Sequence, residues 1–284
     1  MPITYAPARV NYGFDAAAMP KWQMVPVGGE RVLNVSGVGG RQIRVRDTSI
    51  LSATFTGKSG KGSLKLKGLK AGKTFVEWVP DAAGFTGPLQ DKNLLEVSVK
   101  AEKKIRTAFH YVKDNAGHKT ARKKGDLGKL IQNINAILTP QSNVKIEKKS
   151  AGDVTVPQDL GAVVRFVGSS LRAAPHNVPA TEHEWDDVTK FADSSADFNM
   201  FFVWKYEQDA TPNVNNTRAG TLASEKNCLV DDVISNSAET LAHETIHLLG
   251  INAHSTDSTH LIGTGRTDRK ITRGQANQIN PSGT

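Results

Sequence analysis

The N-terminal third of the chain contains short segments in which hydrophobic and polar residues alternate. In Ser63–Lys67 the alternation is strict, as is typical of a strand with one buried face. Further apolar segments separated by Gly and Pro predict strands at Arg31–Val35, Gln42–Val45, Ala53–Phe55, Thr74–Val79 and Leu94–Val99. Several short strands at this spacing predict a β-sandwich.

The pattern changes after the charged segment Lys100–Lys104. Ile105–Val112 predicts the first strand of a second domain, and the apolar residues of Leu127–Leu138 recur at helical spacing. Asp126 is a candidate cap for that helix, and Pro140 is expected to close it. Further strands are predicted at Val144–Ile146, Ala162–Val167 and Met200–Tyr206. We therefore divide the chain into domains 1–104 and 105–284.

A second helix is predicted over Ala238–Leu249, which contains no Gly or Pro. Asn236 can cap its start, and Glu239 three residues later can complete a capping box. Gly250 stands where a helix ends in a left-handed residue. The chain is therefore expected to turn back at this point.

The same helix carries a dense group of candidate metal ligands. His243 and His247 are four residues apart, so both imidazoles lie on one helix face and can bind a single zinc ion. Glu244 follows the first His, where it can act as a general base. Four of the eight histidines fall within residues 243–260. The spacing predicts one Zn²⁺ per chain.

The segment His243–His254 reads HETIHLLGINAH, and it resembles the zinc-binding signature of the metzincin peptidases. Residues 258–267 and 271–276 are similar to the part that follows the zinc helix in many bacterial metzincin-like proteases. The chain departs from that signature at two positions. Ala253 stands where the third His is usual, one residue before His254, and Ile262 stands where the turn below the metal usually carries Met.

Three residues compete for the place of third ligand. Because Gly250 ends the helix, a ligand from the next few residues is favoured, and His254 is the first zinc-competent side chain to follow. Asp257 and His260 are the alternatives. A carboxylate can replace the imidazole on zinc, whereas His260 is expected to pack beside the site.

The resemblance implies a zinc endopeptidase whose α/β domain carries an active-site helix, with His243, His247 and His254 as ligands and Glu244 as base. It also implies that an edge strand before the helix pairs with an extended protein or peptide substrate. Our candidate is Ala219, Gly220 and Thr221, within 217–223. Together with the N-terminal β-sandwich, this predicts an α+β chain.

Composition limits the other function classes. The chain has 284 residues and 38% hydrophobic content, which suits soluble domains without a membrane span. Met1–Ala6 lacks the basic start and apolar core of a secretory signal peptide. The single Cys228 excludes an intramolecular disulfide. We expect synthesis in the cytoplasm and, since an active peptidase would endanger its own cytosol, export by a signal-independent route as a toxin or effector.

The positive charge belongs to the N-terminal domain. Residues 1–104 hold 16 Lys and Arg against 8 Asp and Glu, which already equals the net charge of +8 of the whole chain. Leu64–Phe75 resembles a strand–turn–strand of bacterial immunoglobulin-like domains, which implies a docking role. An anionic partner or a component of a secretion machinery would fit this charge. No nucleic-acid motif is present, and the lysines are spread along strands as on a solvated sheet face.

Two classes of function remain at this stage. The first is a zinc endopeptidase, and the second is a binding or adhesion protein whose zinc module is structural or degenerate. Glu244 discriminates between them, because a structural site needs no general base. It favours the enzyme.

Overall fold

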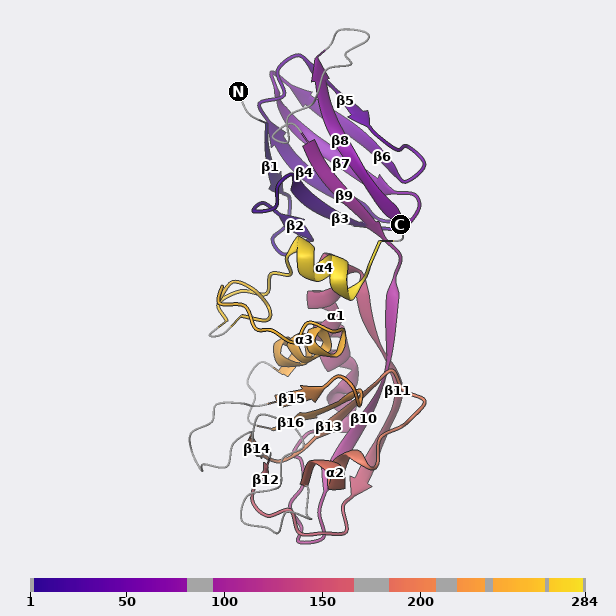
Figure 1. Cartoon of the computed structure of the whole chain (residues 1–284), viewed down its shortest axis with the longest axis vertical. Coiled ribbons are helices and arrows are strands. Elements are labelled where there is room, and N and C mark those ends of the chain that lie inside the picture. Colours follow the sequence, from indigo (N-terminus) through magenta and orange to yellow (C-terminus); the bar gives the residue numbers. More distant parts are fainter. Residues whose placement is uncertain are drawn as a thin grey trace. The chain divides into compact units, whose positions relative to one another are not determined.

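The structure is a computed structural model that describes residues 3–80, 94–165, 184–207, 219–232, 237–263 and 266–282. The chain forms two compact units (Figure 1). The first combines Met1–Lys103 with Ile137–Val144 and Ser255–Thr284, and the second combines Lys104–Ala136 with Lys145–His254. The boundary at residue 104 stays a prediction, but the contacts group the C-terminal thirty residues with the N-terminal strands.

The first unit is built on two sheets. One has the order β1-β4-β7-β6 and the other the order β2-β3-β9-β8-β5. Their strands are β1 (Thr4–Pro7), β2 (Phe14–Asp15), β3 (Lys21–Pro26), β4 (Glu30–Ser36), β5 (Arg41–Val45), β6 (Leu51–Lys58), β7 (Lys61–Gly68), β8 (Gly72–Pro80) and β9 (Leu94–Lys100). The strands predicted between residues 31 and 99 are all present, whereas β1, β2 and β3 were not predicted.

Both sheets of this unit contribute to one hydrophobic core. Leu64 and Leu66 of β7 are fully buried, and the lysines between and after them are exposed. Trp78 of β8 belongs to the same core, with its ring edge-on to Phe55 at 5.1 Å. The alternation seen in the sequence is therefore the alternation between this core and solvent.

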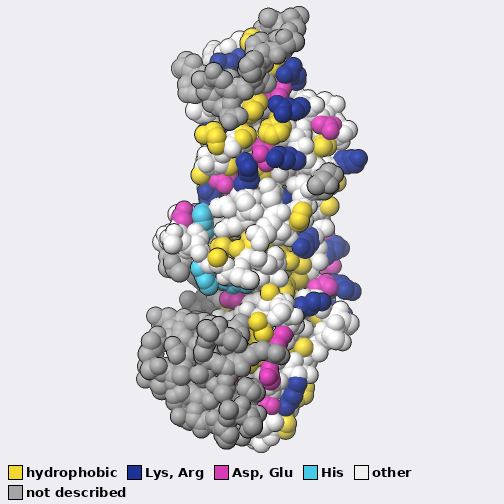
Figure 2. All heavy atoms as spheres, in the orientation of Figure 1, with side chains coloured by type: hydrophobic (Ala, Val, Ile, Leu, Met, Phe, Trp, Pro, Cys, Tyr) yellow, Lys and Arg dark blue, Asp and Glu magenta, His cyan; other side chains and the backbone are white. Residues whose placement is uncertain are grey.

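Part of the positive charge of this unit is paired within the unit. Arg44 and Arg46 both bond to the buried carboxylate of Glu77, at 2.7 and 2.6 Å. Lys65 pairs with Glu30 at 2.9 Å. Figure 2 shows Lys and Arg side chains (dark blue) spread over the visible face instead of gathered into one patch. A docking role for the unit stays a prediction.

The C-terminal segment packs on these sheets through α4 (Arg273–Ile279). Its start is a capping box, in which Gln275 N–H donates to the hydroxyl of Thr272 and the Gln275 side chain accepts from Thr272 N–H. At its end, the buried ammonium of Lys100 donates to the Asn277 side chain at 2.9 Å and to the Asn280 carbonyl. Burial lowers the pKa of Lys100 to about 8.

The second unit is built on a five-stranded sheet with the order β11-β10-β13-β16-β15. β10, β13 and β16 run parallel, and β15 is antiparallel to β16 at the end of the sheet. The elements in this part of the chain are β10 (Lys103–Lys113), α1 (Leu127–Ser142), β11 (Val144–Thr155), α2 (Glu184–Thr189), β13 (Phe198–Phe202), β15 (Ala219–Leu222), β16 (Asn227–Val230) and α3 (Ser237–Leu248), with a two-stranded ladder of β12 (Val164–Arg165) and β14 (Tyr206–Glu207). The last turns of α1 and the first residue of β11 group with the first unit.

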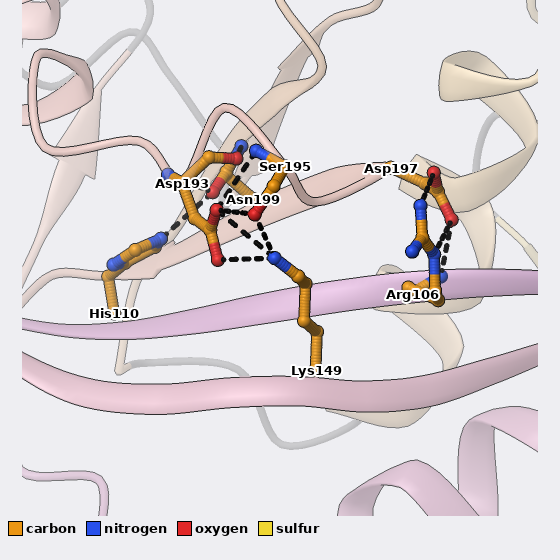
Figure 3. A network of polar contacts seen from close by, with 7 residues as sticks. All are labelled: Arg106, His110, Lys149, Asp193, Ser195, Asp197 and Asn199. Atoms are coloured by element: carbon orange, nitrogen blue, oxygen red, sulfur yellow. Dashed lines mark hydrogen bonds and ion pairs between the residues drawn. The ribbon is translucent and has the colours of Figure 1, made fainter.

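A polar network ties the turn before β13 to the neighbouring strands (Figure 3). Asn199 accepts from Asp193 N–H at 2.8 Å and contacts His110 of β10 at 3.0 Å. Hydrogen bonds from Ser195 and Lys149 lower the pKa of Asp193 to about 2. His110 stacks on the ring of Phe201 and takes part in this network without lying among the metal-competent groups of the described residues.

The predicted fold class is wrong. Strands account for 43% of the structure and helices for 19%, so the chain is mainly β and not the predicted combination of an immunoglobulin-like β-sandwich and an α/β metzincin-like domain. The five-stranded sheet of the first unit contains the parallel pair β3–β9, whereas immunoglobulin-type sheets are antiparallel. Pro140 also does not close α1, which continues to Ser142.

Candidate metal centre

Helix α3 ends at the turn that Gly250 was predicted to make. Gly250 adopts φ +95°, a conformation that residues with a Cβ rarely adopt. Its N–H donates to the His247 carbonyl at 3.0 Å, and Ile251 N–H donates to the Ile246 carbonyl at 3.3 Å. These two bonds form a Schellman motif. The chain therefore turns back beside the last turn of the helix, as expected.

The turn brings His254 to the two histidines of α3. The Nε2 atoms are 2.9 Å apart between His243 and His247, 3.2 Å between His243 and His254, and 3.3 Å between His247 and His254. Tetrahedral zinc holds its nitrogen ligands at about 2.0–2.1 Å, which places them roughly 3.3 Å from one another. The triangle of nitrogen atoms therefore has nearly the size that a zinc ion requires.

The tautomer of His247 supports the same interpretation. Its Nδ1 lies 2.6 Å from the carbonyl oxygen of Ile251. Because a carbonyl only accepts, Nδ1 carries the proton, and Nε2 of the neutral ring presents a lone pair to the other two histidines. Metal-bound histidines commonly make this kind of outer hydrogen bond. The residues present fit a zinc ion.

The three histidines differ in their exposure to solvent. His243 is buried, with 6% of its surface exposed, whereas His247 is partly exposed and His254 is exposed. Histidine side chains (cyan) are visible at the surface in Figure 2. Because His254 is exposed, a fourth ligand could reach the group from solvent, as at catalytic zinc sites.

Glu244 points into the protein from the same helix. Its side chain is 5% exposed, and its Oε2 accepts a hydrogen bond from the hydroxyl of Thr221 at 2.6 Å. Two further buried groups lie near this carboxylate. Burial raises the pKa of Cys228 and of Tyr206, and the charge of Glu244 raises both further. The base candidate is therefore held between α3 and β15.

The structure places the two alternative third ligands differently from His254. Asp257 and His260 pair with each other at 3.3 Å, and the second ring nitrogen of His260 contacts Ser255 at 2.7 Å. Among the described residues, the metal-competent group at this place comprises His243 and His247 of α3 and His254 after the turn. Ile262, which stands where the resembling signature usually carries Met, is buried.

A second group of metal-competent side chains lies in the same unit. His118 Nδ1 is 2.8 Å from buried Asp114 and 3.7 Å from Asp159. Asp114 also accepts from the backbone N–H groups of His118 and Leu160. Through these bonds the Asp114 carboxylate holds the surrounding loops together, which explains its burial without a metal ion. The spacing of these three residues in the sequence does not match a metal-binding motif, and His118 was not predicted to take part in a site.

Sequence reasoning missed the hydroxyl of Thr221 as a partner of Glu244. Thr221 was singled out only as part of the edge strand Ala219–Thr221, which the structure places in β15 at the end of the sheet. Residues 217 and 218 of the wider candidate strand, and the candidate cap Asn236, lie outside the described residues. The sequence feature that could have indicated the contact is the Thr221 hydroxyl on a strand that precedes the helix. Its partner Glu244 lies 23 residues further along the chain, however, so no local pattern connects the two.

No protein-family model and no curated protein matches this sequence. The fold is similar to a solved structure described as metalloproteinase-II from Bacteroides fragilis, with a TM-score of 0.35 and 11% identity over 90% of this chain and 84% of that chain. That neighbour is a metalloproteinase, but so low a score carries no argument. The metzincin and immunoglobulin-like resemblances gain no sequence-level support, and the function must be argued from the residues.

Proposed function

We propose that the chain is a zinc-dependent endopeptidase. The observation that carries the proposal is the convergence of three imidazole Nε2 atoms within 3.3 Å of one another, next to a glutamate on the same helix. Three protein ligands with one side open are typical of catalytic zinc, whereas structural zinc sites have four protein ligands. Within the part of the chain that the structure describes, the group offers three.

His243, His247 and His254 would hold the ion. When bound, zinc supplies Lewis acidity toward a peptide carbonyl and toward water. Ile251 fixes the ring of His247 through the bond to Nδ1, so that its lone pair is already aligned. The Schellman turn at Gly250 sets the position from which His254 completes the triangle.

Glu244 would accept the proton of the attacking water and pass it to the leaving amine, as a general base and then a general acid. Among the described residues, the metal-competent group consists of the three histidines without Glu244, whose Oε2 accepts from Thr221 on the side of β15. A structural metal site has no use for such a base. This supports the enzyme over the binding protein.

The substrate would be an extended segment of protein. β15 ends the five-stranded sheet, and α3 packs against it. An extended peptide can add to such an edge through backbone hydrogen bonds. Ala219 and Gly220 are small residues that let another backbone approach.

Within the described residues, no helix is long and apolar enough to cross a bilayer.

The test compares three zinc-loaded proteins on an unfolded protein substrate: wild type, Glu244→Ala and Glu239→Ala. Glu239 lies in the first turn of the same helix and serves as the matched control. We expect Glu244→Ala to lose at least about a hundredfold in rate while it retains one zinc per chain, and Glu239→Ala to behave like wild type. An active Glu244→Ala protein, or loss of zinc from it, would contradict the assignment.

A further inference from the structure

We propose that Thr221 is a positioning residue for Glu244, because its hydroxyl fixes the orientation of the Glu244 carboxylate. The inference rests on the proposed function and extends it to a residue outside the zinc helix. It assigns to Thr221 a role distinct from the backbone pairing expected of its strand.

The contact is short and its direction is determined. A carboxylate can only accept, so the Thr221 hydroxyl is the donor to Oε2 at 2.6 Å. Hydrogen bonds between a hydroxyl and a carboxylate at this length are charge-assisted and stronger than neutral ones. Oε2 of Glu244 is therefore held on the side of β15.

Both partners are held by regular structure. Thr221 lies opposite the fully buried Cys228 in the antiparallel ladder of β15 and β16, and a threonine side chain is stiff at χ1. Glu244 lies in the middle of α3, which packs against β15. A free glutamate side chain has three rotatable bonds. The hydrogen bond restricts that freedom, and a displacement of about 1 Å in a catalytic group can cost a hundredfold in rate.

A merely structural role would predict something different. Thr107 of β10 is fully buried, whereas Thr221 is half-buried, and the Thr107 hydroxyl donates to the Ile105 carbonyl. It therefore provides a control for the loss of a threonine hydroxyl in the same sheet. If Thr221 only stabilised the sheet, Thr221→Val and Thr107→Val would have similar consequences.

The experiment measures kcat, KM and zinc content for wild type, Thr221→Val, Thr221→Ser and Thr107→Val in the full chain. We expect Thr221→Val to lower kcat roughly ten- to a hundredfold with KM within about twofold and one zinc retained. Thr221→Ser, which keeps the hydroxyl, should restore most of kcat, and Thr107→Val should stay near wild type. An unchanged kcat in Thr221→Val, or a rise in KM alone, would overturn the proposal.

A second readout is independent of activity. In metal-free protein, the melting temperatures of Thr221→Val, Glu244→Ala and the double variant test whether the two side chains are coupled. We expect the double variant to lose less than the two single losses combined, and simple additivity would overturn the contact. An inactive wild type would refute the proposed function and with it this role. An active wild type with an inactive Glu244→Ala and a fully active Thr221→Val would refute this role alone.

Discussion

Replacement of Gly250 by Ala tests whether the turn after α3 builds the site. Gly250 adopts φ +95°, and an added Cβ would meet nothing within 4 Å. The cost is therefore conformational and not steric toward neighbours. Holding a residue with a Cβ in such a conformation costs about 1–2 kcal/mol. In a unit of this size that corresponds to a loss of about 2–8 °C in melting temperature.

The substitution should also lower the affinity for zinc. If the turn relaxes to relieve it, the bond from His247 to Ile251 and the position of His254 change together. An energy of 1–2 kcal/mol corresponds to about a 5- to 30-fold change in an equilibrium constant, which sets the upper range for the loss of zinc affinity. Chelator competition measures the affinity, and thermal unfolding of the metal-free protein measures the strain.

Gly152→Ala is the matched control. Gly152 lies in β11 of the same unit, and its added Cβ would also meet nothing within 4 Å. It does not have a positive φ among the described glycines. We expect this variant to melt close to wild type. Equal melting temperatures and zinc affinities for the two variants would refute the argument that the left-handed turn at Gly250 sets the third ligand.

Two further predictions concern the third ligand and the C-terminal segment. His254→Ala should weaken zinc binding far more than Asp257→Ala or His260→Ala. The reason is that His254 completes the triangle of nitrogen atoms, whereas Asp257 and His260 pair with each other. Loss of zinc from Asp257→Ala or His260→Ala, with zinc retained in His254→Ala, would contradict the geometry. Burial lowers the pKa of Lys100 from 10.5 to about 8, so between these values the unfolded chain binds more protons than the folded one and stability rises with pH. The melting temperature of wild type relative to Lys100→Met should therefore increase from pH 8 to pH 10, and a constant difference would show that Lys100 titrates normally.

Local structure could be predicted from the sequence where a pattern has one explanation. Alternation in residues 63–67 gave the strand β7, and Gly250 after a run without Gly or Pro gave the end of α3. The His243 and His247 pair follows from helical periodicity alone. The roles of these histidines and of Glu244 stay predictions, although the structure brings the side chains into the expected arrangement.

The fold class could not be predicted, because alternation identifies a strand but not its partners. Nothing in residues 21–26 indicated that β3 would pair in parallel with β9, about seventy residues away. The C-terminal segment was placed with the zinc helix by its resemblance, yet it packs on the N-terminal sheets, where Lys100 donates to Asn277 and Asp15 accepts from Arg273 N–H. The Thr221 contact was missed for the same reason, since hydrogen bonds between distant elements leave no local pattern.

The central claim is that the three histidines hold one zinc ion that peptide hydrolysis requires. Its most direct test is a titration of metal-free protein with zinc, in which cleavage of an unfolded protein is followed at each addition. The account predicts a rise in rate that saturates at one equivalent per chain. Cleavage at full rate without metal, or no cleavage at any equivalent, would contradict it.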